Sequence, residues 1–220
     1  MIEEERVIER IARRYEGRWL QGYARGKLRS DPVFAAAFAL LKDAPLAVLD
    51  IGCGVGLFEF YLRERGYAAA LAGFDFDAAK IAHAQRIAAA SFTGVNFSVS
   101  DTTQAQPEGE RGHVVIFDVL HYLEAAEQRD VLERAAERVA PGGLCLIRET
   151  PRDGSWRFHA TRLEEAVIHA IFWMKSRAVH FPTVGEVIGP FERRGFTVEV
   201  RPLWGRTPFN SYLFILRAPR

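Results

Sequence analysis

The chain has 220 residues, of which 49% are hydrophobic, and its 29 basic and 28 acidic residues give a formal net charge of +1. This length suffices for one substantial core and predicts a single domain over residues 1–220. The near-neutral charge gives no electrostatic basis for binding nucleic acid. The two cysteines make no disulfide framework, and neither a signal-peptide pattern nor a long apolar window is present. We therefore expect a cytoplasmic protein without membrane insertion.

Apolar spacing predicts an N-terminal helical cap over residues 1–43, with helices at 2–15 and 18–29. Asp31 and Pro32 are typical of the N-cap and first position of a third helix. A cofactor-binding core follows over residues 46–150, with predicted strands at 46–50, 70–75, 95–99, 112–118 and 143–149 and predicted helices at 56–65, 77–90 and 124–139. Strands separated by helices favour a parallel sheet with helices on both faces.

The last third of the chain predicts a helical insertion over residues 151–182, with its helix near 159–177. Residues 183–220 are expected to form a last helix, which Thr183 caps, and a terminal hairpin of two strands, 196–203 and 210–217. The predicted fold is α/β: a seven-stranded, Rossmann-like, doubly wound sheet, mostly parallel, with an antiparallel last strand.

The segment from Ala47 to Gly56 is the most informative part of the sequence, because an apolar run ends in an acid and three alternating glycines. Such a run predicts a buried strand that turns tightly into a helix, whose free N–H groups attract polar or anionic ligand groups. Gly52, Gly54 and Gly56 give G-x-G-x-G, whereas the dinucleotide fingerprint requires glycine where Leu57 stands. A cofactor site is expected here, and the spacing disfavours NAD.

Acidic residues follow the next predicted strands, and each suits one part of an adenosine-like ligand. Asp75 lies nineteen positions after Gly56, a spacing that lets its carboxylate accept hydrogen bonds from two ribose hydroxyls. Asp101 can accept a hydrogen bond from an adenine amino group, while the backbone N–H of Thr102 donates to a ring nitrogen. Two roles remain open for Asp50, which either contacts the ligand or holds N–H groups of the glycine loop.

In this order, these segments resemble the motifs of the class I S-adenosylmethionine-dependent methyltransferases. The similar segments are Val48 to Gly56, Ala72 to Asp77, Ser100-Asp101, Val114 to Tyr122 and Val139 to Gly143. The resemblance implies S-adenosylmethionine as cofactor, with its methionine end over the glycine loop and its ammonium near Asp118. The implied cofactor residues are Asp50, Gly52, Cys53, Gly54, Gly56, Asp75, Phe76, Asp101, Thr102 and Asp118.

Methyl transfer from an activated sulfonium mainly requires alignment of acceptor, methyl carbon and sulfur. A hydroxyl or amine acceptor also needs a base, and His121 is the predicted catalytic base because it lies just past the fourth strand. A structural role for His121 remains the alternative. Cys53 is expected to be a small turn residue rather than a nucleophile, because no neighbouring base is indicated.

Aromatic and basic residues outside the sheet predict a small-molecule acceptor, aromatic or acyl, with an anionic group that arginine could hold. The candidate contact residues are Tyr15, Trp19, Tyr23, Lys27, Arg29, Trp156, His159, Trp204, Arg206 and Asn210. The alternative for each is a place in the core or on a solvated face. Two segments, Lys27 to Val33 and Pro202 to Asn210, also resemble small bacterial methyltransferases of aryl-polyene or related lipid-like pigment synthesis, which implies an aryl or acyl acceptor.

Two other functions remain open. The same strand, glycine loop and ribose acid suit an NAD-dependent oxidoreductase, and a non-catalytic cofactor-binding module is compatible because methyl transfer requires no invariant catalytic side chain. The six histidines and two cysteines lack metal-ligand spacing, so no metal is predicted. No oligomeric state follows from the sequence.

Overall fold

The computed structural model describes residues 2–104, 109–161, 178–204 and 210–220. These residues fall into two compact units, 1–113 and 114–220, and each unit is considered by itself. The predicted fold class is confirmed, because the seven strands give a mostly parallel, Rossmann-like sheet in which the last strand is antiparallel. No helix among the described residues is long and apolar enough to cross a membrane.

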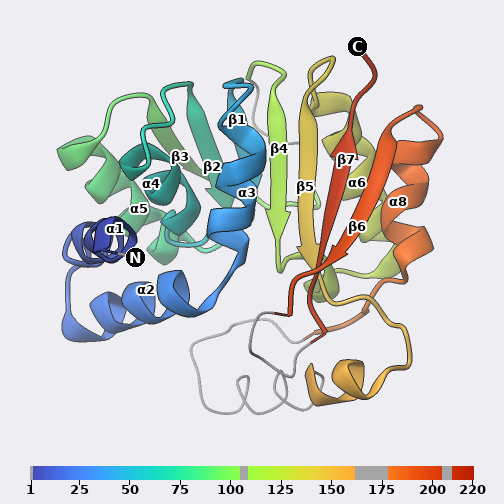
Figure 1. Cartoon of the computed structure of the whole chain (residues 1–220), viewed down its shortest axis with the longest axis horizontal. Coiled ribbons are helices and arrows are strands. Elements are labelled where there is room, and N and C mark those ends of the chain that lie inside the picture. The colour runs from blue at the N-terminus through green and yellow to red at the C-terminus, as the bar shows by residue number, and fades with distance from the viewer. Residues whose placement is uncertain (1, 105–108, 162–177, 205–209) are drawn as a thin grey trace. The chain divides into compact units, whose positions relative to one another are not determined.

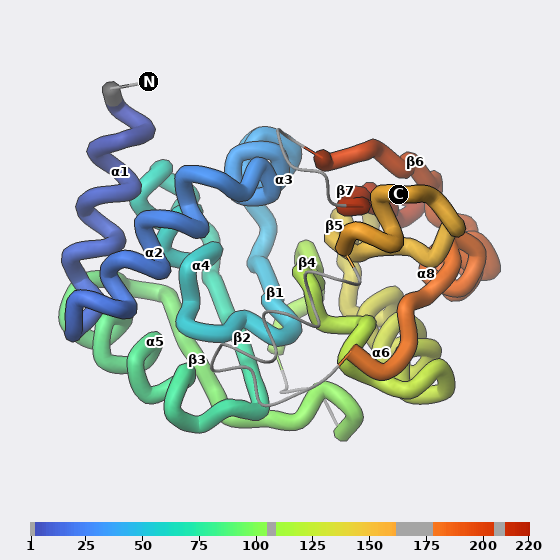
Figure 2. Tube along the Cα trace, turned by 90° about the horizontal axis from the view of Figure 1, so that it is seen from below, coloured from blue at the N-terminus to red at the C-terminus, as the bar shows by residue number. Residues whose placement is uncertain are grey.

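Three helices open the first unit: α1 (Ile2–Ala12), α2 (Arg18–Ser30) and α3 (Val33–Leu41). α1 and α2 lie side by side (Figure 1, Figure 2). Residues at helical spacing, such as Ile11 on α1 and Leu20 on α2, are buried, as the apolar pattern predicts. On the outer side, Arg25 Nε lies 2.6 Å from Glu9 Oε1 and links the two helices.

The rest of the first unit alternates strands and helices: β1 (Val48–Ile51), α4 (Leu57–Glu64), β2 (Leu71–Asp75), α5 (Ala78–Ser91) and β3 (Val95–Val99). The strands are parallel in the order β3-β2-β1 (Figure 1). α4 packs against β2, and α5 packs against β2 and β3. Because the carboxyl ends of parallel strands meet at one edge, the segments that follow β1, β2 and β3 come together there.

The second unit contains β4 (His113–Phe117), the short 3₁₀ helix η1 (Leu120–Tyr122), α6 (Ala125–Arg138), β5 (Leu144–Glu149), α8 (Val184–Glu192), β6 (Thr197–Pro202) and β7 (Tyr212–Arg217). β4 and β5 are parallel, while β7 lies antiparallel between β5 and β6. The predicted terminal hairpin is therefore confirmed. α6 packs against α8, and α8 packs against β6 and β7.

Two local predictions need comment. α3 begins one residue later than expected: Pro32 occupies the cap position, and the Asp31 carboxylate accepts a hydrogen bond of 3.0 Å from the Val33 N–H. In the predicted insertion, residues 156–161 are helical, so the helix begins earlier than expected, and residues 162–177 lie outside the described part of the chain. The single-domain division stays a prediction.

Candidate cofactor and acceptor site

The glycine loop after β1 has the tight, left-handed geometry that its sequence predicts. Gly52, Gly54 and Gly56 have φ values of 81°, 58° and 80°, a region that residues with a side chain rarely adopt. The N–H groups of Gly52 and Cys53 donate to the Phe74 carbonyl at 2.8 and 3.1 Å. The loop is thus tied to β2 before α4 begins.

The second and third glycines serve different purposes. A Cβ on Gly56 would lie 2.6 Å from Phe97 Cζ and 3.2 Å from Ala84 Cβ, so this position must be glycine for packing as well as for its φ value. A Cβ on Gly54 would meet no atom of the described residues within 4 Å. Gly54 therefore presents an open face of backbone, the feature that close approach of a ligand requires.

Asp75, at the end of β2, holds the glycine loop directly. Its Oδ2 accepts a hydrogen bond of 3.0 Å from the Gly54 N–H, and its Oδ1 accepts one of 2.9 Å from the Asp77 N–H. The side chain is buried, and each oxygen keeps a second lone pair that can accept from a hydroxyl. One carboxylate therefore orders the loop and remains suited to the predicted ribose contact.

Asp50 does not hold the loop N–H groups in the described residues; its neighbour is instead the carboxyl group of Glu59, in the first turn of α4, which packs against the β2 partner of Asp50, Gly73. Burial, followed by the nearby charge of Asp75, raises the pKa of Asp50 to about 8, although the contact with Glu59 acts in the opposite direction. Glu59 is wholly buried, and burial followed by the charge of Asp50 raises its pKa well above the usual value. The sequence analysis missed Glu59, although an acid inside the apolar run of residues 57–62 was a usable signal.

Tyr15 supports the glycine loop from the core, where the sequence analysis had placed it among the acceptor contacts. Only 2% of Tyr15 is exposed, and its hydroxyl donates a hydrogen bond of 2.9 Å to the Val55 carbonyl. A phenol buried in this way does not face an acceptor, so the prediction for Tyr15 is corrected to loop support. Burial raises the pKa of Tyr15 well above its usual value.

Cys53 matches the expected turn residue. Burial, followed by the charges of Glu59, Asp50 and Asp75, raises the pKa of its thiol well above the usual value. The thiolate that a nucleophile requires is therefore disfavoured.

The remaining predicted cofactor residues of the first unit follow β2 and β3. Phe76 is half exposed beside the buried Asp75. Asp101 is exposed, and its Oδ1 accepts hydrogen bonds of 2.9 and 2.8 Å from the backbone N–H and hydroxyl of Thr103. Thr102 is buried between them. The Ser100 N–H donates to the Asp75 carbonyl at 3.1 Å, which joins the two strand ends.

In the second unit, Asp118 follows β4 in a left-handed conformation with φ of 58°, which aspartate tolerates better than most residues. Its carboxylate forms an ion pair with Arg148 on β5, and its N–H donates to the Arg148 carbonyl at 3.0 Å. The sequence analysis assigned Asp118 to a cofactor ammonium and did not anticipate this internal cation.

His121 lies in η1 and is buried with Glu149, the last residue of β5. Its Nδ1 is 2.8 Å from Glu149 Oε1, and its ring stacks on Phe181 at 5.6 Å with an interplanar angle of 10°. The same carboxylate oxygen accepts a hydrogen bond of 2.7 Å from the Thr150 N–H. A carboxylate on Nδ1 fixes the proton there, which makes Nε2 the basic nitrogen. Glu149 was missed, although an acid at a strand's carboxyl end was a usable signal.

Comparison with known proteins agrees with this geometry. Residues 48–143 match the family model described as a methyltransferase domain. Magnesium protoporphyrin IX methyltransferase from Synechocystis PCC 6803, solved with bound S-adenosylhomocysteine, has a TM-score of 0.66 and 18% identity, with 92% of this chain and 89% of that chain covered. Residues 48–143 are thus similar to a methyltransferase domain, and the fold is similar to that of a solved methyltransferase.

The curated relatives match only part of this chain. Trans-aconitate 2-methyltransferase of Methylobacterium nodulans is 33% identical over 108 residues, which are 49% of this chain and 39% of that protein. The Mycobacterium tuberculosis enzyme of the same name is 28% identical over 139 residues, 61% of this chain and 50% of that protein. The chain thus spans half or less of the length of these relatives. The narrower resemblance to pigment-pathway enzymes stays a prediction.

On α2, the structure separates the predicted acceptor residues into two kinds. Trp19 and Tyr23 are half exposed and stack with ring centroids 5.8 Å apart and an interplanar angle of 3°. Lys27 Nζ lies 2.8 Å from Asp31 Oδ2, and Arg29 pairs with Glu5. The aromatic pair is thus half exposed, whereas both cations already neutralise carboxylates within the unit.

In the second unit, Arg157 organises two predicted acceptor residues. Its guanidinium lies 4.8 Å from the Trp156 ring centroid and 4.4 Å from that of Trp204. Trp156 is 65% exposed, and His159, one turn further along the helical residues 156–161, is also exposed. Arg206 lies outside the described residues.

Asn210 was also predicted to contact the acceptor, but the structure buries it completely. Its side-chain amide donates hydrogen bonds of 3.0 Å to the Pro151 carbonyl and to Asp153 Oδ2, and its backbone N–H donates to the Thr161 hydroxyl at 2.7 Å. Asn210 therefore ties the start of the insertion to β7, and its predicted role is corrected to this structural one.

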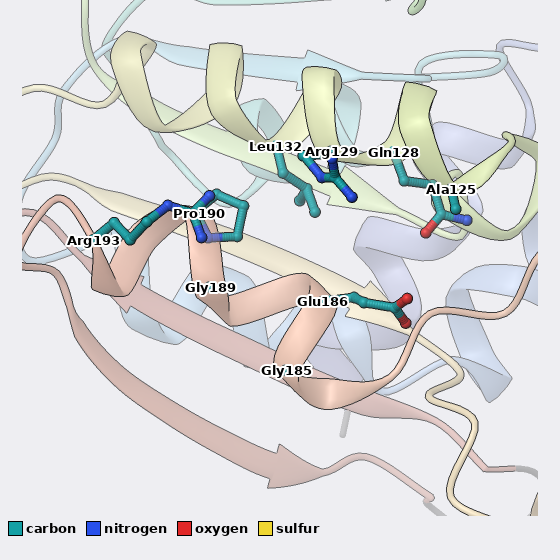
Figure 3. A pocket seen from close by; sticks show the side chains of 9 residues that line it. All are labelled: Ala125, Gln128, Arg129, Leu132, Gly185, Glu186, Gly189, Pro190 and Arg193. Carbon is teal, nitrogen blue, oxygen red and sulfur yellow. The ribbon is translucent and has the colours of Figure 1, made fainter.

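A small pocket of about 100 Å³ lies between α6 and α8, where the labelled side chains of the two helices face one another (Figure 3). Its lining includes Gln128, Arg129, Glu186 and Arg193, and none of the predicted site residues. Within the described ranges, no group of three or more potential metal ligands occurs.

Proposed function

We propose that this chain transfers the methyl group of S-adenosylmethionine to a small-molecule acceptor that carries an anionic group. The observation that carries the proposal is the hydrogen bond from Gly54 to Asp75, because it combines an open glycine backbone with a buried ribose-type acid in one place. The half-exposed ring of Phe76 beside Asp75 fits the adenine end of the same cofactor.

The cofactor, when bound, supplies an electrophilic methyl group on a sulfonium. The chain's residues then have distinct tasks: Gly52 and Gly54 let the ligand approach the backbone, Asp75 accepts from ribose hydroxyls, and Asp101 with Thr102 receives the adenine edge. Most of the rate comes from holding the two reactants in line, since the leaving group is already activated.

His121 is the proposed base for an acceptor hydroxyl or carboxylic acid. The hydrogen bond to Glu149 keeps the proton on Nδ1, so that Nε2 can take a proton from the acceptor, and it stabilises the imidazolium that results. Glu149 is thus a positioning residue, and the stack on Phe181 fixes the ring plane.

An aromatic or acyl carboxylate is the proposed acceptor class. The relatives named trans-aconitate 2-methyltransferase carry the name of a carboxylate substrate. The Arg157 guanidinium lies over the rings of Trp156 and Trp204, and a planar guanidinium suits a carboxylate. A cytoplasmic location and the absence of a nucleic-acid partner stay predictions.

Ligand binding tests the cofactor part of the proposal. S-adenosylhomocysteine should raise the melting temperature, whereas NADH should not. Asp75→Ala should weaken S-adenosylhomocysteine binding by roughly 1.5–3 kcal/mol, because charged hydrogen bonds are lost. A melting-temperature shift with NADH alone would refute the proposal.

Turnover tests the catalytic part. Purified protein is incubated with methyl-labelled S-adenosylmethionine and a panel of aryl, acyl and di- or tricarboxylic acids. With the best acceptor, His121→Ala should lower kcat roughly 100-fold or more with unchanged S-adenosylhomocysteine affinity. His83→Ala, on α5, is the matched control. Equal kcat values for the two variants would remove His121 from catalysis.

A further inference from the structure

One buried acid is not used by the proposed function. Glu59 is 0% exposed, and in the described residues no N–H or hydroxyl of another residue donates to either of its carboxyl oxygens. An ionised carboxylate without donors costs several kcal/mol in such a place. We therefore expect the negative charge of Glu59 to be reduced by a proton rather than balanced by hydrogen-bond donors.

The structure supports this expectation, because the carboxyl group of Glu59 packs against Gly73, which is the β2 partner of Asp50 in the sheet. Burial, followed by the charge of Asp50, raises the pKa of Glu59, and two neighbouring buried carboxyl groups can hydrogen-bond to each other only if one of them holds a proton. The contact has a steric requirement: a Cβ on Gly73 would lie 2.2 Å from Glu59 Oε1, so the carboxyl group packs against a bare glycine. The pair is held together by packing as well as by the proton.

The surroundings favour keeping that proton at neutral pH. Burial and then the charge of Asp75, on β2, raise the pKa of Asp50. Burial and then the charge of Glu59 raise the pKa values of Cys53, in the loop, and of Tyr15, before α2. Tyr23 on α2 acts on Tyr15 in turn. Among the described residues of the first unit, none of these neighbouring groups is a cation.

We propose that Glu59 is a positioning residue of the cofactor site, which shares one proton with Asp50 and releases it to solvent when the cationic groups of the cofactor bind over the glycine loop. The inference rests on the proposed function. The O–H electron pair stays on the carboxyl oxygen, and the proton passes to water or buffer. The carboxyl groups of Asp50 and Glu59 are then both negatively charged and stabilise the positive charge of the ligand.

Asp75 connects the pair to the ligand-facing side of the loop. Its carboxylate repels the charge of Asp50 and also accepts the Gly54 N–H at 3.0 Å, and the opposite face of Gly54 is open. A cation over Gly54 favours the ionised form of nearby carboxyl groups and so lowers their affinity for protons. Cofactor binding and proton release are therefore coupled.

Calorimetry measures the coupling. S-adenosylmethionine and S-adenosylhomocysteine are titrated at pH 7 in buffers of different ionisation enthalpy, and the slope of binding enthalpy against buffer enthalpy counts protons. We expect the release of about half a proton or more for S-adenosylmethionine, and an affinity that rises roughly three- to tenfold from pH 6 to pH 8. Wild-type binding without proton release would overturn the inference and leave the proposed function standing.

Glu59→Gln preserves the size of the side chain, and its amide can donate to Asp50 but has no acidic proton to share. Binding should persist, while proton release falls to near zero and the pH dependence of affinity flattens. Glu64→Gln, on the same helix, is the matched control, because Glu64 pairs with Arg10 and Arg14 and should leave proton release unchanged. Equal proton release in wild type and Glu59→Gln would overturn the inference.

A second measurement needs no cofactor. Between pH 5 and pH 8 the free energy of unfolding of the wild type should fall more steeply than that of Glu59→Gln, and equal slopes would overturn the shared proton. If Glu59→Gln does not fold, the number of protons that the wild type releases on binding S-adenosylmethionine tests the inference by itself. Absence of any wild-type binding would instead refute the proposed function, and the coupling with it.

Discussion

Replacement of Gly54 or Gly56 by alanine should separate ligand binding from folding, because the two glycines share a left-handed backbone but differ in what lies beside them. A side chain in this region costs about 1–2 kcal/mol, which is the loss of stability expected for Gly54→Ala. In Gly56→Ala the new Cβ also lies 2.6 Å from Phe97 Cζ, and relief of that overlap costs a further ~1–3 kcal/mol. The expected totals are therefore about 1–2 kcal/mol and roughly 2–5 kcal/mol.

Urea unfolding followed by circular dichroism measures both losses, and calorimetric titration with S-adenosylhomocysteine measures binding. Gly54→Ala should weaken binding at least about tenfold, because its Cβ occupies the open face of the loop. Equal losses of stability in the two variants would contradict the packing argument for Gly56. Wild-type affinity in folded Gly54→Ala would show that no ligand approaches this backbone.

Three further predictions concern stability. Tyr15→Phe should cost about 1–2 kcal/mol in urea unfolding, because a buried hydrogen bond is lost, while Tyr23→Phe on the surface should cost little; equal effects would contradict the role of Tyr15. Asn210→Ala should cost about 1–3 kcal/mol and speed proteolysis in residues 151–161, and an unchanged digestion pattern would argue against its anchoring role. The pKa of Asp50 is about 8 in the folded protein, against a reference value of 3.8. Its contribution to the free energy of unfolding is therefore fully present below about pH 4 and is lost as the pH rises through 8. A free energy of unfolding of the wild type that rises across this pH range would refute the assignment.

The elements of the sheet were predictable because their signals are local. The glycine loop and the apolar strands depend on residues close together in the sequence, and the observed bounds of β1 to β3 differ from the predicted ones by at most two residues. The place of Asp75 at the end of β2 was predictable for the same reason, while its contact with a ribose stays a prediction. Periodicity and spacing therefore predicted the fold class.

The side chains that depend on distant partners were not predictable in this way. Arg29 was assigned to an acceptor, but its acid, Glu5, lies 24 positions earlier on a neighbouring helix. Tyr15 and Asn210 were chosen as polar or aromatic residues outside the sheet, and only tertiary packing reveals that both are buried. The partner of His121 likewise required the pairing of η1 with the end of β5.

The contact between Glu59 and Gly73 constrains how this protein can diverge. A Cβ at position 73 would lie 2.2 Å from Glu59 Oε1 and 2.7 Å from Cys53 Cβ, so the glycine at position 73 should be inherited together with the residues at positions 53 and 59. Relatives with alanine or a larger residue at position 73 should carry smaller residues at both of the other positions. The three positions, on the glycine loop, α4 and β2, would then evolve as a single unit.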